Sequence, residues 1–237
     1  MTECSNLHKP FIEMFELRSS QEISKQFNLV MDFEEMKSHL ISVYDGRIKR
    51  WLQAMDNYDR GIIGHTFRVT AISLELGRIL GLKKEQLLYI QYGTLLHDIG
   101  KLGIPDSIIQ KPGKLTPEEF KVVQKHPLYA YEWLSSRNEF QPAKVIPLFH
   151  HERWDGTGYP RRLKGKEIPL LARVVAIVDV WDALTSDRPY RCAMSNKQAF
   201  RLIQSETGAH FDPDIVNAFM ELGQMGSRNL PFSHALI

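Results

Sequence analysis

Residues 150–160 read HHERWDGTGYP and set two imidazoles side by side, directly before a turn that holds two glycines, a tyrosine and a proline. A plain helical domain has no need of adjacent histidines. A second string, LLHDIGKLGIP at 95–105, joins His97 to Asp98 near the end of an apolar helical run. A carboxylate in such surroundings is rarely buried without a partner. The two strings together point to a metal site.

The remaining candidates extend this pattern. Asp179 resembles Asp98, because it too lies within an otherwise apolar helical run. A hydrogen bond to a helix terminus would explain one such aspartate, whereas two of them with several histidines suggest divalent cations. Each histidine taken alone is more often a packed or solvated residue than a ligand, so the inference rests on the set. The candidate ligands are His65, His97, Asp98, His126, His150, His151 and Asp179.

The chemistry of this ligand set is that of a catalytic centre. Imidazoles and carboxylates without thiolates suit iron, manganese, zinc, cobalt or nickel rather than a structural zinc. A single metal seldom needs seven ligands, but two metals that share a bridging carboxylate use them naturally. Such a pair, about 3.5–4 Å apart, can activate hydroxide for phosphoester cleavage. The other histidines, which are His8, His39, His210 and His234, are interpreted as structural or surface residues.

The composition is that of an ordinary globular protein. Of 237 residues, 43% are hydrophobic and 24% are charged, and the net charge of +2 is too small to predict a nucleic-acid polymer or a membrane surface as partner. Cys4 and Cys192 form no CxxC pair, which argues against disulfides and a cysteine-ligated zinc. The N-terminus lacks the pattern of a signal peptide, and no apolar run approaches the roughly 18 residues of a membrane span. We expect a soluble, cytoplasmic protein.

Helical periodicity runs through nearly the whole chain. Segments 68–80 and 85–99 carry apolar residues at helical spacing. The run 172–187 is apolar almost all the way round, which predicts a buried central helix. Further helices begin with good caps at 195 and 212, and convincing strand alternation is not evident. The predicted fold class is all-α.

The string LTPEEF defines one helix start more sharply. Thr116 is placed as an N-cap, with Pro117 in the first helical position and Glu119 three residues after the cap, as in a capping box. We expect this helix to end near His126, because Pro127 disfavours helical geometry in the residue before it.

The N-terminal region is less regular. Phe33, Met36, Leu40 and Val43 follow 3-4-3 spacing, which suggests an amphipathic helix leading into the main domain. A helix that packs on the core and a short connector or dimer contact are both compatible with this pattern, since under two heptads cannot establish a coiled coil.

Taken in order, these strings resemble the HD-GYP family, the branch of the HD metal-dependent phosphohydrolases that hydrolyses cyclic di-GMP. The resemblance covers about residues 40–225. A lone HD doublet would be weak evidence, whereas this ordered set is specific. The matching motifs are HTFRV (65–69), HDIGKLGIPDSII (97–109), KPGKLTPEEF (111–120), HP (126–127), HHERWDGTGYP (150–160), IPLLARVVAIVDVWDALTSDRPYR (168–191) and HFDP (210–213).

The resemblance implies an HD-type bundle of about seven helices around a bimetal centre. Residues 1–39 would form an N-terminal helical extension or connector, 40–225 the catalytic domain and 226–237 a tail. Two divalent ions, iron or manganese, would occupy the centre. By the same resemblance the first ion is held by His65, His97, Asp98 and Asp179, and Asp98 bridges to the second, which is completed by His126, His150 and His151.

Substrate contacts are expected around the metals. Gly156 and Gly158 would let the loop turn tightly and approach a ligand, although a plain helix-connecting turn is the alternative. Arginine suits bidentate contact with phosphate and stacking on a base, which favours the two arginines of DRPYR over ordinary surface charge. Asp182 lies one helical turn after Asp179 and is expected to orient a ligand or a substrate group. The expected substrate-binding residues are Lys101, Tyr159, Asp182, Arg188 and Arg191, and the expected catalytic residues are Asp98 and Lys101.

The resemblance therefore implies a cyclic di-GMP phosphodiesterase that yields linear pGpG and, after a second cut, GMP. Two alternatives stay open. One is an HD phosphohydrolase of another nucleotide, such as a different cyclic dinucleotide, and the other is a signalling module that binds the nucleotide or a partner protein with negligible turnover. A homodimer or a sensory or signalling protein is an expected partner.

The metal count is a first testable prediction. Some HD-GYP proteins bind a third ion through a glutamate four residues before the first histidine, one helical turn away. Here that position is Gly61, which has no side-chain oxygen, and Asp59 is six residues before His65, off the same helical face. We predict two metals per chain. Elemental analysis against protein concentration checks this, and a fully occupied third ion beside the other two would contradict it.

Overall fold

The structure is a computed structural model, and it describes residues 60–136, 143–187 and 192–229. Helices dominate these residues, which contain no strand beyond an isolated bridge between Thr207 and Phe211. The all-α prediction is confirmed. In the same residues, no helix has the length and apolar character needed to cross a membrane.

Several predictions fall outside these ranges. The amphipathic pattern from Phe33 to Val43, Asp59, and the phosphate-binding roles of Arg188 and Arg191 all lie outside the described residues. The domain boundaries at 39/40 and 225/226 likewise stay predictions.

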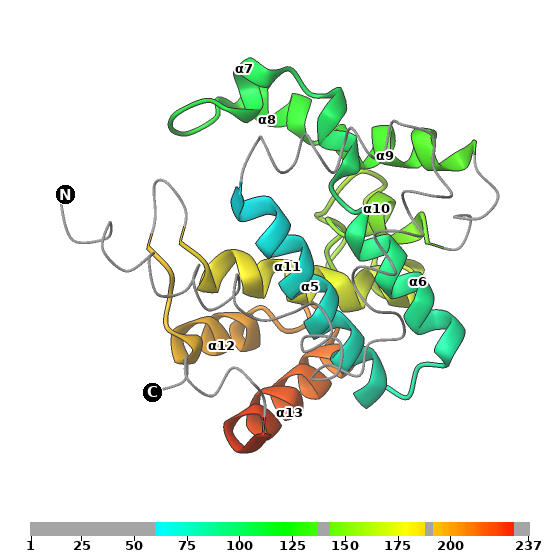
Figure 1. The fold of residues 1–237 in the computed structure, drawn as a ribbon, viewed down its shortest axis with the longest axis vertical. Helices are drawn as coiled ribbons and strands as arrows, with labels where there is room; N and C mark the ends of the chain where they lie inside the picture. The colour runs from blue at the N-terminus through cyan, green and yellow to red at the C-terminus, as the bar shows by residue number, and fades with distance from the viewer. Residues whose placement is uncertain (1–59, 137–142, 188–191, 230–237) are drawn as a thin grey trace. The chain divides into compact units, whose positions relative to one another are not determined.

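The helices follow one another with short connections (Figure 1). In chain order they are α5 (Arg60–Ile79), α6 (Lys84–Leu95), the 3-10 helix η1 (Ile99–Gly103), α7 (Asp106–Ile109), α8 (Pro117–Val123), α9 (His126–Ser135), α10 (Val145–Phe149), the 3-10 helix η3 (Gly165–Glu167), α11 (Leu170–Thr185), α12 (Asn196–Ser205) and α13 (Pro213–Asn229).

Helix α11 is the centre of the described residues, as its sequence predicts. It packs against α5, α6, α10, α12 and α13, and Figure 1 shows α5 crossing it. Val174, Val175, Ile177 and Val178 have no exposed surface. A helix that is apolar on all sides must be enclosed by others, because burial of apolar surface is the main favourable contribution to folding. The carboxylates that α11 carries are thereby brought into the interior.

The predicted capping box of α8 is confirmed. The hydroxyl of Thr116 accepts a hydrogen bond from the backbone N–H of Glu119 at 3.2 Å, and the Glu119 carboxylate accepts one from the Thr116 N–H at 2.7 Å. The predicted end of this helix near His126 is wrong in detail. Helix α8 ends at Val123, and His126 instead begins α9, with Pro127 in the first turn, where its missing N–H costs nothing.

The predicted helix 85–99 also ends earlier, at Leu95, and the chain then turns through the HD doublet into η1. This turn packs tightly on the start of α9. A Cβ added at Gly100 would lie 1.9 Å from the carbonyl oxygen of His126 and 2.7 Å from the backbone nitrogen of Ala130. Only glycine permits this contact, which sets Asp98 beside His126.

Gly100→Ala should therefore destabilise the protein. The added methyl meets backbone rather than a movable side chain, so η1 and α9 must separate, at a cost of about 1–3 kcal/mol or more. Thermal unfolding should show a Tm lower by several degrees, as is typical for a domain of this size. Ser136→Ala, at the exposed end of α9, is the control and should leave the Tm nearly unchanged. Equal Tm values for the two variants would contradict the packing argument.

Candidate metal centre

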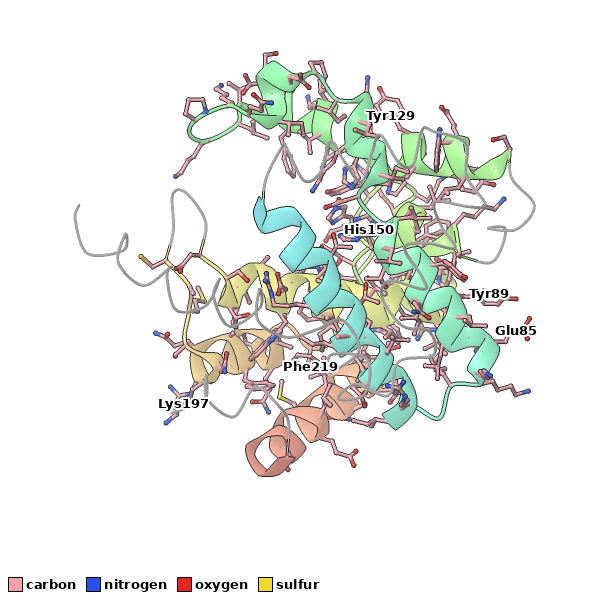
Figure 2. The ribbon with its side chains drawn as sticks, viewed as in Figure 1. Glu85, Tyr89, Tyr129, His150, Lys197 and Phe219 are labelled. Carbon is pink, nitrogen blue, oxygen red and sulfur yellow. The ribbon has the colours of Figure 1, made fainter. Side chains whose placement is uncertain are left out.

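The seven candidate ligands converge in the interior of the described residues. They come from α5, the turn after α6, the start of α9, the end of α10 and the middle of α11. Figure 2 shows His150 inside the helical framework rather than at its edge. His97, His126 and His150 are at most 2% exposed. The fold thus brings together the seven residues predicted as ligands, although they span more than a hundred positions of the chain.

The first group of ligand atoms lies around Nε2 of His65. This atom is 3.4 Å from Nε2 of His97 and 3.3 Å from Oδ1 of Asp179. Both imidazoles already use Nδ1 elsewhere, His65 toward a carboxylate and His97 toward the carbonyl of Thr94 at 2.5 Å. A neutral imidazole that donates through Nδ1 presents a lone pair at Nε2. Lone pairs and carboxylate oxygens at these distances repel one another unless a cation lies between them.

The second group lies around Asp98 and the paired histidines. Ligand atoms of Asp98, His126, His150 and His151 all lie within 4.8 Å of one another. Nδ1 of His126 is 2.8 Å from the carbonyl of Val123, and Nδ1 of His150 is 3.0 Å from that of Pro147. Their Nε2 atoms are buried without a hydrogen-bond partner. Buried nitrogens left in this state are expected at a site that takes a metal ion.

Asp98 belongs to both groups. Its Oδ2 lies 3.4 Å from Nε2 of His97 and its Oδ1 lies 3.5 Å from Nε2 of His126. Burial acts to raise the pKa of Asp98, but the ammonium of Lys101 and the surrounding imidazoles outweigh it and hold the pKa well below its usual range. The carboxylate is ionised, and each of its oxygens faces one of the two groups of imidazoles.

The paired histidines are held in the neutral form. Burial lowers the pKa of His150 well below its ordinary value, and neighbouring imidazoles, first that of His151, act in the same direction. Burial likewise lowers the pKa of His151 to about 3. Metal ligands must be deprotonated, so neutral imidazoles around an ionised carboxylate form a donor set ready to bind a divalent ion.

Asp182 lies behind the first group. Its Oδ2 accepts a hydrogen bond from Nδ1 of His65 at 2.8 Å, and Arg68 holds both of its oxygens, at 2.5 and 2.9 Å. The residue is 2% exposed. Burial opposes ionisation, but the bonds from His65 and Arg68 lower the pKa of Asp182 to about 2. Of the two roles expected for Asp182, this geometry favours orienting a ligand over contacting substrate.

Arg68, which donates to both oxygens of Asp182, was not among the site residues predicted from the sequence. Its guanidinium also donates to the hydroxyl of Ser186 at 3.0 Å, so it links α5 to the end of α11. The signal available in the sequence was its position one helical turn after His65, within HTFRV, on the same side of α5.

The GYP loop folds back on the paired histidines. Gly156 has a φ of +84°, which confirms the tight turn. A Cβ at Gly158 would lie 2.3 Å from the backbone nitrogen of Arg153, so the close approach is to the loop's own backbone rather than to a ligand. The buried Glu152, another residue missed from the sequence, accepts hydrogen bonds from the N–H groups of Arg161 and Leu163 at 2.6 and 3.1 Å and closes the loop.

Two predicted substrate contacts border the cluster. The ammonium of Lys101 lies 2.6 Å from Oδ2 of Asp98, with 36% of its side chain exposed. The ring of Tyr159 stacks on His151, with 4.8 Å between centroids. Burial raises the pKa of the Tyr159 hydroxyl above its ordinary value, and Asp98 and Asp179 add to the shift, so it remains a hydrogen-bond donor.

Comparison with known proteins decides the family. The model of a family described as "HD domain" matches residues 50–215. The chain is a member of the HD domain family. Membership implies divalent metal ions, in agreement with the donor atoms around Asp98, and the resemblance drawn from the motifs is confirmed.

Curated relatives of this HD domain include a "Cyclic di-GMP phosphodiesterase" of Thermotoga maritima, 44% identical over 160 residues, which are 67% of this chain and 44% of the relative. A "3'3'-cGAMP-specific phosphodiesterase 2" of Vibrio cholerae is 36% identical over 221 residues, 92% of this chain and 41% of the relative. The chain thus spans less than half the length of either protein.

A solved structure agrees with the HD domain fold. Bd1817, an HDGYP protein from Bdellovibrio bacteriovorus, superposes with a TM-score of 0.57 at 21% identity, over 86% of this chain and 68% of that one. The likeness extends the all-α assignment to an HD-type helical bundle.

The pairing of Asp182 with His65 predicts a specific effect on metal affinity. Asp182→Asn keeps the shape of the side chain but loses the charge that orients His65. We therefore expect the affinity for the metal ion held by the His65 group to fall about ten- to hundredfold. Titration of the chelator-treated protein with Mn²⁺, followed calorimetrically, measures this.

Asp212→Asn is the matched control, because Asp212 is also buried and is also paired with an arginine, Arg173. Both variants lose a buried ion pair, and only Asp182→Asn should weaken metal binding. Equal losses of affinity would attribute the effect to stability alone.

Proposed function

We propose that this HD domain is a metal-dependent phosphodiesterase that hydrolyses cyclic di-GMP to linear pGpG and then, by a second cut, to GMP. The observation that carries the proposal is that two groups of imidazole nitrogens converge on the carboxylate of Asp98. The curated relative from T. maritima, named for cyclic di-GMP, supports the choice of substrate. A complete donor set favours turnover over a module that only binds the nucleotide.

Two divalent ions, iron or manganese, fit the two groups of donors. His65, His97, Asp98 and Asp179 would hold one ion, and Asp98 with His126, His150 and His151 the other. When bound, the ions supply Lewis acidity toward phosphoryl oxygens and lower the pKa of water near them.

The chain's own residues would bind and orient the phosphodiester. The side chain of Lys101 is 36% exposed, and its ammonium donates to Asp98 at the edge of the cluster. There it can pair with a phosphate oxygen or assist the departing ribose oxygen. The Tyr159 hydroxyl stays protonated and can donate to a phosphate oxygen. We assign phosphate contacts to Arg188 and Arg191 from the sequence, through bidentate geometry.

A second candidate substrate is 3'3'-cGAMP. The V. cholerae relative named for that nucleotide aligns over 92% of this chain, which supports it as the second candidate. The two substrates differ in one base and share the phosphodiester ring. A cytoplasmic location and a homodimer or signalling partner remain predictions.

The test is to incubate the metal-loaded protein separately with cyclic di-GMP and 3'3'-cGAMP and to separate the products by chromatography. We expect pGpG from cyclic di-GMP at the higher rate. Faster cleavage of 3'3'-cGAMP would favour the second candidate, and no cleavage of either would reject the phosphodiesterase.

Asp98→Ala links this activity to the metal centre. Because the carboxylate serves both groups of donors, its loss should remove metal binding and hydrolysis together, while helicity measured by circular dichroism survives the loss of one small side chain. A variant that retains both metals and full turnover would remove Asp98 from the shared position.

A further inference from the structure

Two exposed apolar side chains belong to segments that contact residues of the metal cluster. Among the described residues, the large hydrophobic side chains that are exposed are Leu102 at 59%, Phe120 at 47% and Leu202 at 39%. Leu102 directly follows Lys101, whose ammonium contacts Asp98, and Phe120 contacts the GYP loop. Leu202 lies apart, on α12. Exposed apolar surface of this kind, at the border of a polar site, favours contact with a ligand.

Phe120 is connected to the metal ligands by a series of rings. Its ring centroid is 6.5 Å from that of Tyr159, with the planes at 83°, an edge-to-face arrangement. Tyr159 in turn stacks on His151, with 4.8 Å between centroids and 28° between planes. The three rings lead from the paired histidines outward, and Phe120 presents the free aromatic surface at the end.

The backbone that carries Phe120 is held firmly. The capping box of Thr116 and Glu119 fixes the start of α8, and Lys111 donates to both oxygens of Glu119 at 2.8 and 2.7 Å, which ties the preceding loop to the helix. A side chain on a fixed backbone loses little entropy when a ligand covers it, so the ring is preorganised for contact.

Helix packing accounts for only part of this residue. Phe120 is the fourth residue after the N-cap, and Leu115 precedes the cap, which are the positions of a hydrophobic staple. A staple contact would cover part of the side chain, and 47% of the residue is exposed. Glu118 and Lys121 beside it are exposed and charged, so the apolar surface is the size of one ring, too small for a protein interface.

We propose that Phe120 is a nucleobase platform, on which one base of the cyclic dinucleotide stacks while its phosphate lies at the metal cluster. The inference rests on the proposed function and adds a substrate-binding residue to it. Stacking of bases on aromatic rings is favourable and tolerates any base, because every base has a π face. Phe120 would therefore strengthen the binding of cyclic dinucleotides in general rather than select guanine.

The test compares Phe120→Ala, Phe120→Leu and Phe120→Trp in steady-state hydrolysis of cyclic di-GMP by the metal-loaded protein. Alanine and leucine should raise KM about fivefold to a hundredfold with kcat nearly unchanged, the range expected for one stacked base. Tryptophan should restore the wild-type KM, since it supplies a ring. Leucine distinguishes stacking from simple apolar burial, because it keeps the apolar character and lacks the π face.

Leu202→Ala is the matched control, because it also truncates an exposed apolar side chain, on α12 rather than on α8. It should leave KM unchanged. Metal content and Tm are measured for every variant, so that a disturbance passed through Tyr159 to His151 is detected. An unchanged KM in Phe120→Ala, or leucine matching wild type, overturns the platform. Absence of turnover in the wild-type protein would instead reject the proposed function, and the two failures are thereby distinguished.

Discussion

The structure depends on keeping one ionised carboxylate, that of Asp98, between two groups of imidazoles whose lone pairs point at it. These atoms repel one another in a buried, weakly screened interior, so the fold must hold each ring from behind. Three of the histidines are held in the same way: His97, His126 and His150 direct Nδ1 at a carbonyl three residues earlier. The carbonyls near the end of a helix have no partner within that helix, and here the ligand histidines serve as their partners.

Three of the helices near the site end just before a histidine of the cluster. Helix α6 ends at Leu95, α8 at Val123 and α10 at Phe149, and each is followed within three residues by a histidine of the cluster. His65 is the exception, because it lies within α5, where the carbonyls are already engaged by the helix. Its Nδ1 needs a partner from another element, and Asp182 of α11, held by Arg68, provides it. In the first group of ligand atoms, His65 is therefore held by the charged carboxylate of Asp182. In the second group, His126 and His150 are held by neutral backbone carbonyls.

The sequence was sufficient for the features that are local or bound to a motif. Capping at Thr116 and Ser195 and the buried helix, which spans Leu170–Thr185, follow from residue type and spacing, and the seven residues predicted as ligands lie together. Helix ends near the site were misplaced, because apolar periodicity continues through Leu96 and Ile99 although the histidine bonds close the helix at Leu95. The Arg68–Asp182 pair joins positions 114 residues apart, and no local pattern specifies such a contact.

The cost of burying unpaired charge also limits how far the polar interior extends. Behind the ligands, α11 is almost entirely apolar, and Asp182 is accommodated there only because its charge is fully paired. Toward solvent the cluster is bordered by groups with free surface, the ammonium of Lys101 and the ring of Phe120. An anionic group beside the cluster requires counter-charge, and the ammonium of Lys101, which contacts Asp98, supplies it with part of its surface still exposed. The cluster thus lies between the apolar length of α11 and this partly exposed cation, so its charged groups are paired toward the interior and accessible at Lys101.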